Sequence, residues 1–329
     1  MSELNADLVL EGGGVKGIAL VGAYSVIEEL GYTVKRVAGT SAGSIVGALL
    51  AAGMTAEELV AQMRALDYSK FEDKGVVDRV PLLGKALSVL FEDGIYEGDY
   101  AKNWVSKQLA KKSVKTFADL PYDDPDLVSD ERYRLVVIAS DITRGRLRRL
   151  PWDYEVYQLE AGKQAVADAV RASMSIPFIF EPVKLTHREG HESVLVDGGM
   201  LSNFPVDVFD APEGRVPRWP TFGIKLSARA KALEGAIADV HGPIDMTRAM
   251  IKTMTGFYDR MYVDQPDFQA RTIFVDTGSI QATAFDLTDQ QRDTLFENGR
   301  QAAKKFFDGG DGQPPWDWEA YKKRFRNVR

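Results

Sequence analysis

The order of apolar and polar residues near the start of the chain predicts alternating strands and helices. Short apolar runs are followed by longer amphipathic stretches, with glycine or a helix-capping residue between them. The predicted order is a strand at 8–10, a helix at 15–30 ended by Gly31, a strand at 34–38, a helix at 41–52, and a third helix capped by Thr55 and Glu58. This alternation predicts a parallel sheet covered by helices.

The rest of the chain continues the pattern with less regular spacing. It predicts strands at 133–139, 144–150, 194–196, 222–226 and 272–275, and helices at 162–171, 245–262 and 288–307. No linker clearly divides the chain, and no repeat of about 20–50 residues is visible. We therefore predict an α/β fold, with an appendage after Gly309 and Gly310.

Composition narrows the chemistry that the chain can perform. The 329 residues include no cysteine, which excludes disulfides, a cysteine nucleophile and cysteine-bound metal. The chain has three histidines, which are few for a metal site built from histidine side chains. Its net charge of −7 disfavours nucleic acid as a partner. We expect no metal site and no nucleic-acid partner.

Targeting and membrane-spanning patterns are not found in the sequence. The first residues lack the basic and apolar regions of a signal peptide. The longest weakly polar run near the start covers 45–54, whereas a membrane span needs about 20 residues. We expect a cytoplasmic protein, with peripheral contact to a membrane surface left open.

A glycine loop separates the first predicted strand from the first predicted helix. Residues 12–17 read Gly-Gly-Gly-Val-Lys-Gly, which satisfies G-x-G-x-x-G. A dinucleotide site would need an acid near the end of the second strand, and 34–38 contains none. A P-loop would need Lys and Ser or Thr after Gly17, where Ile18 stands. The loop is then a tight turn or a set of N–H groups that binds negative charge, either a phosphate or an oxyanion.

A second glycine-marked turn contains a serine. Residues 39–43 read Gly-Thr-Ser-Ala-Gly, a G-x-S-x-G between a predicted strand and a predicted helix. Such a turn presents a serine nucleophile, because the two glycines let the backbone pass closely. Ser41 is therefore a candidate nucleophile, and its alternative role is that of a helix N-cap.

A third turn places an acid at the end of the predicted strand 194–196. Asp197 is followed by Gly198 and Gly199, and it is a candidate base for Ser41 or part of a simple turn. In an α/β-hydrolase the order would be serine, acid and histidine, which His241 satisfies formally. The topology does not fit, because a single strand precedes the strand that leads into Ser41.

Four blocks taken together resemble the patatin-like phospholipase family. Residues 11–17 (EGGGVKG) look like its oxyanion block with Glu11 in place of Asp, and 39–44 (GTSAGS) match its nucleophile block. Residues 171–180 (RASMSIPFIF) look like its A-S-x-[SA]-x-P-x-x-F block, and 197–199 (DGG) match its D-G-[GA] block. The blocks are in order and cover roughly 6–205.

The resemblance implies a three-layer α/β/α fold with a mainly parallel sheet and a Ser-Asp dyad without histidine. Ser41 would attack an acyl ester of a phospholipid or lysophospholipid, and Asp197 would take its proton. The oxyanion would be held by Gly12, Gly13 and Gly14, and no cofactor is implied. The residues that support the motifs are Lys16, Gly17, Gly39, Gly43, Pro177, Gly198 and Gly199.

The same resemblance sets the expected organisation, with an acyl hydrolase domain at 1–308 and a tail at 309–329. Residues 67–130 match the family loosely and are expected to form a lid-like insertion. Within it, leucines at helical spacing in 81–91 are either a lid that meets lipid or core. A nucleotide site at 12–17 and a catalytically silent member of the same fold are the alternatives. A homo-oligomer and an activating partner are left open.

Overall fold

The computed structural model describes residues 3–71, 96–125, 127, 131–212, 215–226, 265–282, 284–310, 312 and 314–326. Within this part, eight strands form one sheet in the order β5-β6-β3-β2-β1-β7-β8, and β4 also pairs with β3. The strands are β1 (Leu4–Leu10), β2 (Tyr32–Thr40), β3 (Leu135–Asp141), β4 (Arg146–Leu150), β5 (Val183–Thr186), β6 (Glu192–Asp197), β7 (Thr221–Lys225) and β8 (Thr272–Phe274).

The centre of the sheet is parallel and one side of it is antiparallel. Strand β1 pairs in parallel with β2 and β7, β2 pairs in parallel with β3, and β7 with β8. Strands β4 and β6 run antiparallel to β3, and β5 runs antiparallel to β6. The mainly parallel α/β sheet predicted from the sequence is therefore confirmed.

The pairing of β3 brings two strand ends together. Residues 137–141 of β3 pair with β4, so β2 and β6 must both use the other edge of β3. Along that edge, β2 ends at Thr40 opposite Ile138, and β6 ends at Asp197 opposite Ala139. Because β2 and β6 approach from opposite directions, their last residues meet. This junction is where the residues that follow β2 lie against the end of β6.

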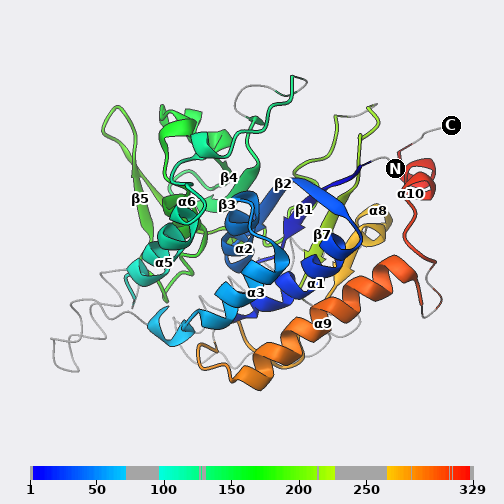
Figure 1. Cartoon of the computed structure of the whole chain (residues 1–329). Helices are drawn as coiled ribbons and strands as arrows, with labels where there is room; N and C mark the ends of the chain where they lie inside the picture. Colours follow the sequence, from blue (N-terminus) through cyan, green and yellow to red (C-terminus); the bar gives the residue numbers. More distant parts are fainter. Residues whose placement is uncertain are drawn as a thin grey trace, which may run out of the picture.

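Six helices of the described part of the chain cover one face of the sheet. They are α1 (Gly17–Glu29), α2 (Ala42–Ala51), α3 (Ala56–Ala65), α5 (Asp99–Ala110), α6 (Val166–Ser173) and α9 (Asp289–Asp308). Figure 1 shows α2 against the sheet and α1 and α9 side by side, with α5 beside α6 and α3 packed on α1. These helices and one face of the strands form the larger apolar core.

The opposite face of the sheet has its own smaller core. Consecutive strand residues point to opposite faces, so Leu8 belongs to the larger core and Val9 to the smaller one. Phe204, Val206 and Phe209 cover this second face, together with Phe268 of α8 (Pro266–Ala270). The sheet therefore lies between two layers.

Several predicted elements have shifted boundaries, and some were not predicted. The capping box at Thr55 and Glu58 is present at the start of α3. The helix predicted at 162–171 begins at Val166, after a 3₁₀ turn at Ala161–Lys163. Helix α5 and strand β5 were not predicted. The helix predicted at 245–262 and the lid-like leucines at 81–91 lie outside the described residues.

The described parts of the expected insertion and tail pack against the rest of the chain. In α5, Ala101, Val105 and Leu109 are buried in the larger core. In the tail, Trp316 packs against the ring of Phe222 in β7, with the centroids 5.2 Å apart, ahead of α10 (Trp318–Phe325). Residues 96–125 are therefore partly core.

Candidate active site

Ser41 occupies a strained turn between β2 and α2. Its backbone has φ 51° and ψ −121°, a left-handed conformation that costs a non-glycine residue about 1–3 kcal/mol. The flanking glycines make the turn possible. A side-chain carbon on Gly39 would overlap the carbonyl oxygen of Gly43, and one on Gly43 would overlap that of Leu10. The G-x-S-x-G spacing thus follows from close backbone passage.

Both backbone polar groups of Ser41 are held by serine hydroxyls. The Ser41 N–H donates to Ser173 Oγ at 2.9 Å. The Ser41 carbonyl oxygen accepts from Ser44 Oγ at 2.6 Å. Ser44 belongs to α2, whereas Ser173 is the last residue of α6. Ser173 lies in the block at 171–180, but no role was predicted for it from the sequence.

Asp197 ends β6 at the junction with β2, and its carboxylate is buried. Oδ1 accepts a hydrogen bond from the Gly199 N–H at 2.7 Å. Oδ2 is buried and has no hydrogen-bond partner of ordinary geometry in the described part of the chain. Burial raises the pKa of Asp197 to about 6, and interactions with the Ser41 hydroxyl and the Gly199 N–H partly offset this effect. The carboxylate is therefore poised to take up a proton near neutral pH.

The glycine loop lies beside Ser41 and is tied to the turn after β6. A side-chain carbon on Gly12 would come within 3.1 Å of Ser41 Cβ. The Gly12 N–H donates to the Asn203 carbonyl at 3.2 Å, and Asn203 Nδ2 donates back to the Gly12 carbonyl at 3.0 Å. Within the described residues, no hydrogen bond from the N–H of Gly13 or Gly14 is found. Two N–H donors thus remain available beside Ser41.

The residue that departs from the family pattern anchors this loop from behind. Glu11 is buried, and its carboxylate accepts from Lys225 Nζ and from the Leu226 N–H. Lys225 is buried as well, so the two charges compensate each other. The longer Glu side chain is therefore accommodated by an ion pair with β7.

The motif-supporting residues hold the backbone rather than face a reacting group. Lys16 Nζ donates to Thr277 Oγ1 at 3.2 Å, and burial lowers the pKa of Lys16. A side-chain carbon on Gly17 would approach Met63 Cε at 3.0 Å. Gly198 packs directly against the Ile138 carbonyl. Pro177 precedes Phe178, a second non-glycine residue with positive φ, at 66°.

A small apolar cavity of about 20 Å³ adjoins Ser41. Apart from Ser41 and the Tyr68 hydroxyl, its lining side chains are apolar, and they come from segments far apart in the sequence. The lining residues are Gly14, Val15, Ser41, Ala42, Ile45, Tyr68, Phe71, Met174, Ile176, Phe180, Ala282 and Phe285. Gly14 and Ser41 belong to motifs identified from the sequence, and residues 174–180 of the lining lie in the block at 171–180. Tyr68, Phe71 and Phe285 were not identified from the sequence, because no local motif marks them.

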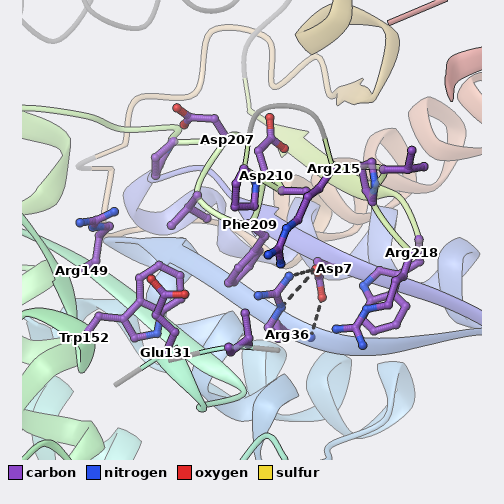
Figure 2. A pocket seen from close by; sticks show the side chains of 18 of the residues that line it. Asp7, Arg36, Glu131, Arg149, Trp152, Asp207, Phe209, Asp210, Arg215 and Arg218 are labelled. Carbon is purple, nitrogen blue, oxygen red and sulfur yellow. Dashed lines mark hydrogen bonds and ion pairs between the residues drawn. The ribbon is translucent and has the colours of Figure 1, made fainter. Parts of the chain in front are cut away.

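A much larger cavity of about 890 Å³ lies away from Ser41 and Asp197, on the opposite face of the sheet. Figure 2 shows Asp7 and Arg36 at its base, joined by hydrogen bonds. The Arg36 guanidinium lies 4.5 Å from the centroid of the Phe209 ring. Asp7 has its charge compensated, unlike Asp197.

The histidines that the structure describes lie outside this site. His187 is buried, with its Nε2 2.9 Å from Ser193 Oγ and its Nδ1 3.3 Å from Arg144 Nη2. His191 is exposed, and His241 lies outside the described residues. No cluster of three or more His, Asp or Glu side chains suited to a metal occurs in the described ranges.

The helices that the structure describes are at most 20 residues long. None of them is long and apolar enough to cross a membrane.

Known proteins share both the sequence and the fold. The sequence model of the patatin-like phospholipase family matches residues 8–210. YqhO of Bacillus subtilis, an uncharacterized protein, is 36% identical over 300 residues, which cover 91% of this chain and 97% of YqhO. The human patatin-like phospholipase domain-containing protein 6 is 27% identical over 201 residues, which cover 61% of this chain but 12% of that protein.

A solved structure, that of VipD from Legionella pneumophila, is similar in fold. It aligns with a TM-score of 0.51 at 19% identity, over 91% of this chain and 66% of VipD. The family match covers both the serine turn and the Asp-Gly-Gly turn. The resemblance and the α/β/α fold expected from the four sequence blocks are confirmed, and this chain belongs to the patatin-like phospholipase family.

Proposed function

We propose that this protein is a serine acyl hydrolase that cleaves acyl esters of phospholipids or lysophospholipids with a Ser41–Asp197 dyad. The observation that carries the proposal is a strained serine turn that abuts a buried carboxylate with an unpartnered oxygen. A buried, unpartnered carboxylate costs stability, and such groups are concentrated at functional sites. Family membership supports lipid hydrolysis as the class of reaction.

In the proposed first half-reaction, Ser41 Oγ attacks the ester carbonyl carbon and its proton passes to Asp197 Oδ2. The tetrahedral oxyanion is held by the N–H groups of Gly13 and Gly14. Gly12 has a different part in the proposal, because its N–H already donates to Asn203 and it must lack a side chain beside Ser41. One such donor is typically worth about 3–4 kcal/mol of transition-state stabilisation.

Collapse of the intermediate completes acyl transfer. The proton on Asp197 passes to the leaving alkoxide, and the acyl group stays on Ser41. Water then attacks the acyl-enzyme with Asp197 as base, a fatty acid leaves, and Ser41 Oγ recovers its proton. A pKa near 6 suits both steps, because the base must lose and regain a proton near neutral pH.

The surroundings of Ser41 favour an apolar acyl group. The cavity beside it is lined by aromatic and aliphatic side chains, among them Phe71, Phe180 and Phe285. Burial of methylene groups against such a surface is favourable by about 0.8 kcal/mol each. We propose a lipid at a membrane surface as the substrate, and a cytoplasmic location remains our expectation.

The alternative of a nucleotide site at 12–17 has less support. The Gly12 and Val15 N–H groups donate to Asn203 and Ala282, and the loop faces the serine turn. A catalytically silent member of the fold would have no need to keep Asp197 buried with one carboxylate oxygen, Oδ2, unpartnered.

The test is lipid analysis of vesicles treated with wild type or with Ser41→Ala. We expect wild type to release fatty acid and to react with a fluorophosphonate, and the variant to do neither. Ser25→Ala is the matched control, because it also removes a buried hydroxyl, one that donates to the Gly22 carbonyl in α1. Undiminished turnover by a folded Ser41→Ala protein would contradict the proposal.

A further inference from the structure

Ser173 connects the serine turn to strand β3 through one hydroxyl. It is fully buried at the end of α6. Its Oγ accepts from the Ser41 N–H at 2.9 Å and donates to the Ile138 carbonyl at 2.5 Å. Ile138 lies opposite Thr40 and next to the partner of Asp197. The hydroxyl therefore bridges the serine turn to the point on β3 where β2 and β6 meet.

The bridge acts on the residue whose backbone is strained. A non-glycine residue keeps a positive φ only where its surroundings over-determine it. The glycines flanking Ser41 allow the turn sterically but do not supply an acceptor for its N–H. Ser173 supplies that acceptor from 132 positions along the chain. Without the Ser173 hydroxyl, the Ser41 N–H would be buried and unpaired. Rotation about φ of Ser41 would then relieve the backbone strain and expose the N–H to another acceptor, and it would move Ser41 Oγ away from Asp197.

The same segment also holds the base, through its backbone. The Asp197 N–H donates to the Ser175 carbonyl at 2.8 Å. Ser175 Oγ in turn donates to the Arg171 carbonyl at 3.0 Å and accepts from the Arg171 guanidinium. Between the two serines, Met174 lines the apolar cavity beside Ser41. Residues 173–175 thus touch the nucleophile, the base and the cavity.

We propose that Ser173 is a positioning residue of the hydrolase, which fixes the orientation of Ser41 Oγ toward Asp197 by holding the Ser41 N–H. The inference rests on the proposed function of Ser41 and Asp197. Ser173 acts through the backbone of the nucleophile and not on substrate. It follows that removal of its hydroxyl slows attack by Ser41 without weakening substrate binding or changing the ionisation of Asp197.

The experiment compares Ser173→Ala, Ser173→Cys and the control Ser25→Ala with wild type on a soluble short-chain ester. For Ser173→Ala we expect kcat and the rate of fluorophosphonate labelling to fall together by about 10- to 100-fold, since small displacements of reacting atoms have effects of this size. We expect KM to stay within twofold and the acid limb of the pH profile to keep its midpoint. Ser173→Cys retains a weak donor and acceptor, so its rates are expected between those of Ala and wild type.

Several results would overturn the proposal. If Ser173→Ala keeps kcat within twofold of Ser25→Ala, or loses activity only through KM, the hydroxyl does not position the nucleophile. If Ser173→Ala fails to fold, Ser173→Cys serves as the test instead. Fluorophosphonate labelling of Ser173→Cys at the wild-type rate would contradict the proposal. If wild type itself shows no turnover that depends on Ser41, the proposed function fails first and this inference fails with it.

Discussion

Two of the hollows in the described part of the protein lie on opposite faces of one sheet, and each has a buried aspartate in its lining or close to it. The larger hollow, about 890 Å³, has Asp7 at its base, where Arg36 donates to both carboxylate oxygens through its guanidinium and its backbone N–H. The smaller hollow, about 20 Å³, adjoins Ser41, and the nearby Asp197 has an oxygen without a partner. The aspartates are nearly equally buried, at 2% and 6% exposure.

The two aspartates differ in their partners rather than in their burial. Burial raises the pKa of Asp7, and hydrogen bonds from Arg36 to both carboxylate oxygens partly offset this effect. Asp197 lacks compensation, so burial raises its pKa to about 6 and leaves Oδ2 available to a neighbouring hydroxyl. The chemistry is therefore expected beside the small apolar hollow.

The largest effect should come from replacing the uncompensated aspartate. Asp197→Asn keeps the shape but cannot accept the serine proton, so we expect kcat to fall by about 10²–10⁴-fold. His241→Ala is the comparison, and it should retain activity within severalfold because the proposed dyad uses no histidine. The measurement is the steady-state kcat of both variants, after circular dichroism has confirmed that they are folded. Equal losses in the two variants would replace the dyad with a triad in which Asp197 orients His241.

The opposite pattern is expected in the large hollow. Asp7→Asn removes the partner of a buried guanidinium, which typically lowers the free energy of unfolding by about 3–5 kcal/mol. The kcat of the protein that remains folded should not change. Urea unfolding and kinetics on the same preparation measure both quantities. A loss of kcat at unchanged stability would show that the two hollows are coupled.

The raised pKa of Asp197 predicts opposite pH trends for activity and stability. Activity should rise through a midpoint near pH 6, as the base becomes ionised. As the pH rises from about 4 to 6, the contribution of Asp197 to the free energy of unfolding should decrease. The reason is that the folded state binds the Asp197 proton more tightly than the unfolded state does in this range. Asp197→Asn should remove this stability trend. An acid limb below pH 5 in wild type would contradict the raised pKa.

A smaller effect is expected from the lining of the apolar cavity. Phe285→Ala removes a ring that contacts Phe71 and Phe180, so it should shift the preference toward longer acyl chains by about tenfold or less. Phe209→Ala in the large hollow is the matched control and should leave chain preference unchanged. The readout is the ratio of kcat/KM for long and short esters. Equal shifts in both variants would mean that the cavity does not select chain length.

Local patterns predicted much of the framework and the position of each motif. The runs at 8–10 and 34–38 lie within β1 and β2, and the helix predicted at 288–307 is α9 within one residue at each end. The two strands are apolar runs, and α9 begins at the Thr288 capping box and ends before Gly309. Helix α5 has a buried stripe as narrow as that of α9, but it begins at Gly98 without a side-chain cap, so no local signal marked its start.

The sequence by itself determined that a glycine loop, a serine turn and an Asp-Gly-Gly turn each follow a strand, because close backbone passage and turn geometry depend on neighbouring residues. Tertiary structure decided what these turns face. The meeting of β2 and β6 on one edge of β3, the bridge from Ser173 to Ser41 and the lining of the apolar cavity join residues far apart in the chain. The pKa of Asp197 depends on the burial that this packing creates, which no local pattern records.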